Sequence, residues 1–228
     1  MHQSAIELNR PVIGNRAWLP PVATPGGLFN RAVLRLDGRL RHRQNIFEFC
    51  DRPHCLLRVA LCVVKTGIIL PDGCQVRRGE VIGELHLWNE HVPIIPAAGP
   101  DLSWAVNIQR RMRQSLVLLS QHVQSDARFD QIRFFRAETR LGGGKPCAQM
   151  ERIARFFGFQ LTRTPPLEGL WHGLIDLGER IHLWAMIRAF NPRALAGRGF
   201  LPTKHELWMS REVLLSKRAP SAIPSTLP

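Results

Sequence analysis

The stretch GCQVRRGEVIGELHLWNE, which runs from Gly73 to Glu90, combines turns with a strand that ends in polar residues. A Pro-Asp-Gly turn at residues 71–73 opens it, because proline presets φ and glycine tolerates a positive φ. A second turn lies at residues 77–80, RRGE, and the residues after it predict a strand over Val81–Leu87. The β-branched run before the first turn predicts another strand over Leu56–Leu70.

Two ionisable side chains share one face of the central strand. Successive side chains of a strand point to opposite faces, so Glu84 and His86 lie on the same side, ~7 Å apart. Such a pair can act as general acid and base or bind a metal ion, and it can equally be a polar pair that closes a half-exposed strand. We take Glu84, His86 and the nearby Glu90 as candidate catalytic residues, and Asn89 as a candidate ligand-binding residue.

The rest of the chain alternates between helical and extended patterns. Helices are predicted over Leu28–Arg41, Asp101–Val123, Pro146–Gly158 and Leu174–Phe190, with a short one from Ser210 to Leu215. Further strands are predicted over Gln131–Thr139, Phe159–Thr164 and Lys204–Ser210. This order predicts an α+β fold: a single compact domain with a small mixed or antiparallel sheet packed by three to four helices.

The two ends of the chain differ in composition from the middle. Repeated prolines and a closing Gly-Gly pair predict a flexible arm over residues 1–25. A proline-rich tail over residues 217–228 is predicted to be disordered. The α+β domain is therefore expected to span residues 26–216.

The longest predicted helix carries three further candidates for ligand binding, Arg110, Arg113 and Ser115. Arginine and hydroxyl side chains bind acidic groups well. Arg113 can hold an acidic ligand, or it can pair with Glu84 or Glu90 inside the fold, and we favour the internal pair.

Two apparent motifs fail on their spacing. The segment GGGK at residues 142–145 is not a phosphate-binding loop, because Thr139 stands where the first glycine is needed and Pro146 replaces the required Ser or Thr. The segment FCDRPHC at residues 49–55 matches no common structural zinc site, so no metal site is predicted. The chain has 5 cysteines and no CxxC pair, which indicates a reducing compartment.

The charge of the chain is strongly positive. In 228 residues, 31 Lys and Arg face 18 Asp and Glu, a formal net charge of +13 that implies an anionic partner. The basic amphipathic helix over Leu28–Arg41 is typical of a membrane-surface binder. No apolar run reaches the ~18 residues of a membrane span, and the first residues, MHQSAIELNRPVIG, lack the apolar region expected of a signal peptide. We expect a cytoplasmic protein, with a peripheral position at the inner membrane as the alternative; neither a cofactor nor an oligomeric state is defined.

Three segments together resemble the YkoP-like family of uncharacterised bacterial proteins. They are GEVIGELHLWN at residues 79–89, RQSL at residues 113–116 and HELWMSREVLL at residues 205–215. The resemblance spans roughly Leu28 to Leu215. It implies a compact α+β domain and, because some members are encoded near envelope-polysaccharide enzymes, a role at the cell envelope. It implies no catalytic residue.

The sequence leaves three classes of function. The first, which we favour, is an accessory domain that binds an anionic lipid or glycan intermediate of envelope polysaccharide metabolism. The second is a hydrolase or transferase that uses Glu84, His86 and Glu90, in which case Glu84 and His86 should share a pocket and have perturbed pKa values. The third is nucleic-acid binding by charge alone, which requires a continuous basic groove.

Overall fold

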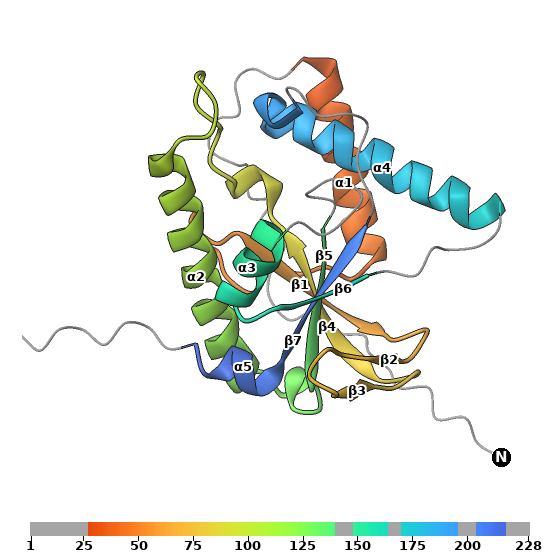
Figure 1. Ribbon diagram of the computed structural model, residues 1–228. Coiled ribbons are helices and arrows are strands. Elements are labelled where there is room, and N and C mark those ends of the chain that lie inside the picture. Colours follow the sequence, from red (N-terminus) through yellow and green to blue (C-terminus); the bar gives the residue numbers. More distant parts are fainter. Residues whose placement is uncertain (1–26, 140–147, 164–169, 196–203, 218–228) are drawn as a thin grey trace, which may run out of the picture.

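A five-stranded mixed sheet forms the centre of the molecule (Figure 1). Its strands lie in the order β1-β4-β5-β7-β6, in which β4 and β5 are parallel and the other neighbours are antiparallel. The strands are β1 (Leu57–Val63), β4 (Val81–Leu87), β5 (Phe134–Thr139), β6 (Gln160–Arg163) and β7 (His205–Ser210). The computed structural model describes residues 27–139, 148–163, 170–195 and 204–217.

Helices surround this sheet. They are α1 (Leu28–Arg43), α2 (Leu102–Ser125), α3 (Ala148–Phe156), α4 (Leu170–Phe190) and α5 (Arg211–Leu215), with short 3-10 turns η1 (Asn89–His91), η2 (Ala127–Phe129) and η3 (Pro192–Leu195). Asp101 caps α2, because its Oδ1 accepts a hydrogen bond from the Trp104 N–H at 2.7 Å. The predicted α+β class and the mixed sheet are confirmed.

One face of the sheet holds the main core. Alternate strand side chains, including Val59, Leu85 and Phe135, are buried in one cluster with Leu116 and Leu119 of α2. Figure 1 shows α2, α3 and α5 on this side of the sheet. The apolar stripe of the longest helix therefore anchors the sheet through its C-terminal half.

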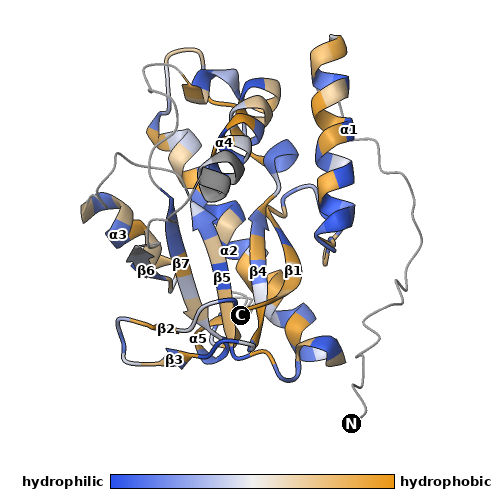
Figure 2. Ribbon diagram, turned by 90° about the vertical axis from the view of Figure 1, so that its right-hand side faces the viewer, coloured by the Kyte–Doolittle hydropathy of each residue, from blue (hydrophilic) through white to orange (hydrophobic). Residues whose placement is uncertain are grey.

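A small hairpin covers the lower half of the opposite face. It consists of β2 (Ile68–Ile69) and β3 (Gln75–Val76), joined by the predicted turn in which Gly73 has φ +85°. Its buried residues pack against Ile82 and Trp208 of the sheet, and Figure 2 shows the hairpin crossing the strands. The single strand predicted over Leu56–Leu70 is wrong, because the chain bends at residues 65–66 and begins the hairpin there.

The upper half of that face is polar and meets the remaining helices. In Figure 2 the upper parts of β5 and β7 are hydrophilic, while α1 and α4 lie above and beside them. These two helices contact each other across the end of the sheet at which the parallel strands β4 and β5 both finish. Ligands commonly bind outside the carboxyl ends of parallel strands.

Several predictions fall on residues outside the described ranges. These are the N-terminal arm, the GGGK segment and the C-terminal tail from residue 218. Apart from the strand predicted over Leu56–Leu70, the predicted elements within the described ranges are present with small shifts in their ends; for example, α4 begins at Leu170 rather than Leu174.

Candidate functional site

A cavity of about 1200 Å³ lies at the end of the sheet where β4 and β5 finish. Its walls come from α1, the first half of α2, α4 and the ends of β1, β4 and β5. Ligand pockets usually measure roughly 300–1,000 Å³, so this cavity can hold a large molecule. We therefore take it as the candidate site.

Most of the cavity wall is apolar. Helix α4 contributes Leu183, Met186, Ile187 and Phe190, while α1 adds Leu36 and Leu40 and α2 adds Ile108 and Met112. This explains part of the apolar character of α4, whose other apolar residues, such as Leu177 and Ile181, face outward and are exposed. An apolar wall of this size favours an apolar ligand surface.

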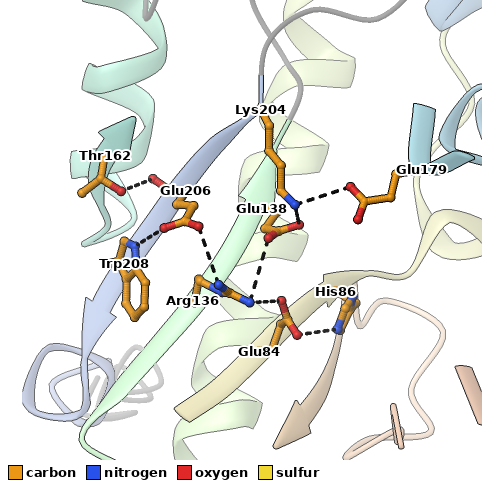
Figure 3. Close-up of polar contacts among 9 residues, drawn as sticks. All are labelled: Glu84, His86, Arg136, Glu138, Thr162, Glu179, Lys204, Glu206 and Trp208. Atoms are coloured by element: carbon orange, nitrogen blue, oxygen red, sulfur yellow. Dashed lines mark hydrogen bonds and ion pairs between the residues drawn. The ribbon is translucent and has the colours of Figure 1, made fainter. Parts of the chain in front are cut away.

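The polar part of the wall begins with a cluster around Arg136 (Figure 3). The Arg136 guanidinium lies 2.7 Å from Glu84, 3.6 Å from Glu206 and 3.9 Å from Glu138. The cross-strand pairing of Glu84 with Arg136, set by the parallel register of β4 and β5, brings the first pair together. Arg136 is thus the hub of this cluster.

Lys204 completes the Arg136 cluster. Its Nζ lies 2.7 Å from Glu138 and 3.4 Å from Glu179 on α4. Burial opposes the charge on Lys204, but the two carboxylates outweigh it and raise the pKa of the ammonium group. The cluster joins four carboxylates to two cations, a formal charge of −2 when His86 is neutral.

Glu84 and His86 lie on the cavity wall and both have perturbed pKa values. Burial opposes the ionisation of Glu84, but the neighbouring Arg136 lowers its pKa overall, which keeps the carboxylate charged at neutral pH. Burial lowers the pKa of His86 despite the attraction of Glu84, so its imidazole is neutral at pH 7. His86 Nε2 lies 3.9 Å from Glu84 Oε2 and has no hydrogen-bond partner among the described residues.

A second cluster surrounds Arg58 on β1. The Arg58 side chain is 5% exposed and lies 3.3 Å from both Glu48 and Glu90, with Asp37 of α1 at 4.0 Å. Its guanidinium also stacks over the Trp88 ring at 4.2 Å. This cluster fastens the amphipathic helix α1 to the sheet.

Asp37 joins the Arg58 cluster to α4. Arg41 lies 2.9 Å from it and His182 of α4 lies 3.5 Å from it. Burial opposes the ionisation of Asp37, but the hydrogen bond from His182 and the two arginines lower its pKa. With three carboxylates and two guanidinium groups, the Arg58 cluster has a formal charge of −1 when His182 is neutral.

The structure separates the predicted site residues into two groups. Glu84, His86 and Asn89 line the cavity. Glu90 is buried against Arg58 and is not part of the lining. The other candidates, Arg110, Arg113 and Ser115, lie on α2 but are not among the residues that line the cavity.

The three candidates on α2 have local contacts. Arg110 donates to Asn107, and Arg113 lies over the Phe156 ring at 5.9 Å. The internal pair that we favoured for Arg113 is wrong, because Glu84 and Glu90 are paired with Arg136 and Arg58. Ser115 is fully buried, accepts a hydrogen bond from the Leu56 N–H and donates to the Arg111 carbonyl, which ties α2 to the start of β1.

Sequence reasoning missed the partners of Glu84 and His86. Arg136 and Glu138 alternate along β5, a period-2 pattern that was visible in the sequence. The polar residues that α1 and α4 contribute, Asp37, Glu179 and His182, carried no comparable signal.

The described residues contain no group of three or more His, Cys, Asp or Glu side chains placed to hold a metal ion. None of the described helices is long and apolar enough to cross a membrane.

The comparisons with known proteins support one assignment. No curated protein and no solved structure matches the chain. A family model described as the YkoP domain matches residues 54–218, which include every strand of the sheet, α2, α4 and the Arg136 cluster. By this match over most of its length, the chain belongs to the YkoP domain family.

Proposed function

We propose that this protein is a binding module for an amphipathic, lipid-like molecule whose apolar part occupies the cavity. The observation that carries the proposal is the cavity itself, about 1200 Å³ with mostly apolar walls and one polar side. Of the lipid and glycan ligands expected from the sequence, the lipid fits these walls better. A glycan would bury hydroxyl groups against apolar side chains, at about 1–3 kcal/mol for each group left without a partner.

The accessory role in envelope polysaccharide metabolism belongs to the same proposal. It rests on the family resemblance, and the cavity adds a binding site of suitable size for a lipid-like intermediate. The amphipathic helix α1 contributes both to the cavity wall and, through Arg31, Arg35 and Arg39, to the exposed surface. In this proposal the basic surface of α1 faces the membrane, on the same helix as part of the site.

A fluorescent probe tests the proposal. N-phenyl-1-naphthylamine is uncharged at pH 7.5 and fluoresces strongly in apolar surroundings, so its titration measures occupation of the cavity. Gly178 on α4 lines the cavity and has open space where a side chain would begin. Gly178→Trp places an indole ring there and is expected to weaken probe binding about tenfold, since the ring removes volume from the site.

Gly173 provides a matched control for this substitution. It lies on the same helix, also has open space at the Cβ position and does not line the cavity. Gly173→Trp is expected to bind the probe like the unmodified protein. Saturable binding that both variants retain equally would place the probe elsewhere and contradict the proposal.

The second candidate function is a hydrolase or transferase, and the observation that favours it is the Glu84–His86 pair on the cavity wall. A neutral imidazole can take a proton from water or from a hydroxyl group as that oxygen attacks a bound ester. Glu84 can orient the ring through Nε2 after a small movement of either side chain. Glu90, behind Arg58, has no part in this arrangement.

Hydrolysis of p-nitrophenyl esters of increasing chain length tests this second candidate. The rate should rise with pH below about 6.5 and level off by pH 7, because the basic form of His86 is the active one and burial lowers its pKa. His86→Asn should reduce the rate about 100-fold or more. His122→Asn is the control, since burial lowers the pKa of His122 too but it lies outside the cavity beside Asp126. Equal rates in both variants would exclude His86 as the base.

The nucleic-acid alternative has less support. Exposed arginines occur on α1, on one side of the sheet, and on α2 and α3, which lie together on the other side in Figure 1. Such scattering favours generic charge attraction over a groove that follows a nucleic-acid backbone.

A further inference from the structure

We infer that the cavity selects an amphipathic ligand with a cationic, hydrogen-bond-donating head, such as a primary ammonium group, and disfavours an anionic head. The inference rests on the proposed function and concerns the polar side of the same cavity. It runs against the net charge of the chain, which is +13 and by itself favours anions.

The charge of the cavity wall has the opposite sign to that of the whole chain. Four carboxylates line the cavity, Asp37, Glu84, Glu138 and Glu179, whereas only two cations do so among the described residues, Arg41 and Arg58. The complete Arg136 and Arg58 clusters also include side chains behind the wall. Their formal charges of −2 and −1 sum to −3. Charges beside a partly desolvated cavity act more strongly on a ligand than charges on the open surface, which salt screens.

The hydrogen-bonding capacity of the wall points in the same direction. Arg41, Arg58, Arg136 and Lys204 already face carboxylates at 2.7–3.3 Å. An ionised carboxylate only accepts hydrogen bonds and has about four lone-pair sites, more than these pairs use. His86 Nε2, which has no hydrogen-bond partner among the described residues, is a further acceptor in the tautomer that carries the proton on Nδ1. The wall therefore offers acceptors, which match the three donors of an ammonium group.

A phosphate or carboxylate head lacks a suitable place on this wall. Such groups bind arginines whose guanidinium N–H groups are available in pairs. Arg58 is 5% exposed and contacts Glu48 and Glu90, and Arg41 contacts Asp37 and Glu48. The Nε atoms of Arg41 and Arg58 make no well-aligned hydrogen bond, but each already lies within 3.3 Å of a carboxylate, which an anionic head would have to displace.

Three amphiphiles with the same ten-carbon chain test the inference. Decylammonium, 1-decanol and decyl sulfate compete with N-phenyl-1-naphthylamine for the full chain at pH 7.5 and 0.15 M salt, where surface charges are largely screened. Decylammonium is expected to displace the probe at about tenfold lower concentration than decyl sulfate, with decanol between them. Equal potency, or a preference for the sulfate, would overturn the inference.

A pair of matched variants locates the effect. Glu179 on the cavity wall and Glu151 on α3 both have side chains that are 47% exposed and ion-paired. Glu179→Gln should weaken the binding of decylammonium about threefold and leave the binding of decanol unchanged. Glu151→Gln should leave the binding of both amphiphiles unchanged. An equal loss of decylammonium affinity in both variants would mean a general charge effect and contradict the inference.

The outcomes also separate this inference from the proposed function. If none of the three amphiphiles displaces the probe, the cavity does not bind apolar chains, and both fail. If all three displace it equally well and Gly178→Trp still blocks them, the binding function stands and the cationic selectivity fails.

Discussion

Replacing Arg58 by methionine is expected to lower the free energy of unfolding by about 3–5 kcal/mol. Methionine is close to arginine in length and retains the apolar contact with Trp88, so the loss comes from the charge. The variant removes the guanidinium beside two buried carboxylates. The exposed fraction of the side chain is 5% for Glu90 and 10% for Asp37. A buried carboxylate without its partner is far more costly than a missing surface pair.

Urea unfolding of Arg58→Met measures this effect, with Arg155→Met as the control. Arg155 is 72% exposed and pairs with Glu151 on the surface of α3, where removal of the pair should cost at most about 1 kcal/mol. Adding Glu90→Gln to Arg58→Met should recover part of the lost stability, because it removes the carboxylate left behind. A loss below about 1 kcal/mol for Arg58→Met would show that the cluster is not a buried charge network.

The elements of this fold were predictable because their signals are local. Val81–Leu87 was predicted with the ends that β4 has, since a glycine turn precedes it and alternation marks its length. The α2 and α5 helices likewise begin at residues that can cap them, Asp101 and Ser210. The strand over Leu56–Leu70 failed because an apolar, β-branched run gives no sign of a bend.

The candidate site was only half predictable, because its partners come from distant parts of the chain. Alternation along one strand placed Glu84 and His86 together, and both line the cavity. The pairing of Glu84 with Arg136 depends on the register between β4 and β5, which local patterns do not contain. Arg113 was misassigned for the same reason, since nothing in α2 shows which side of the sheet the helix covers.

The cavity itself was not predictable from apolar patterns. Met112 and Leu116 lie four residues apart on one face of α2, yet Leu116 is inside the core whereas Met112 packs against its edge and lines the cavity. A helical pattern identifies the side that faces away from water, whether that side meets packed neighbours or an open pocket. Only the position of α1 and α4 at the end of the sheet decides between the two.

Gly83 is the position in the sheet that should tolerate a side chain least. It lies on β4 beside Glu84 and is paired with Phe135 across the sheet. A Cβ on residue 83 would lie 2.5 Å from Phe135 Cε1 and still nearer to Cδ1, and Phe135 is fully buried in the main core. Gly83→Ala is therefore expected to lower the free energy of unfolding by about 1–3 kcal/mol, through displacement of the ring or of the strand.

Thermal or urea unfolding checks this expectation, and two variants define its cause. Gly38→Ala on α1 is the control, because no atom lies within 4 Å of its Cβ position and helical alanine should stabilise the protein by about 0.5–1 kcal/mol. When Phe135→Leu is already present, adding Gly83→Ala should lower the free energy of unfolding by less than it does beside Phe135, because leucine is smaller and relieves the overlap. If the strand moves instead of the ring, Glu84 shifts from Arg136 on the cavity wall, and in that case Gly83→Ala weakens probe binding as well as stability. If the alanine costs the same in both backgrounds, the Phe135 ring is not what excludes a side chain at residue 83.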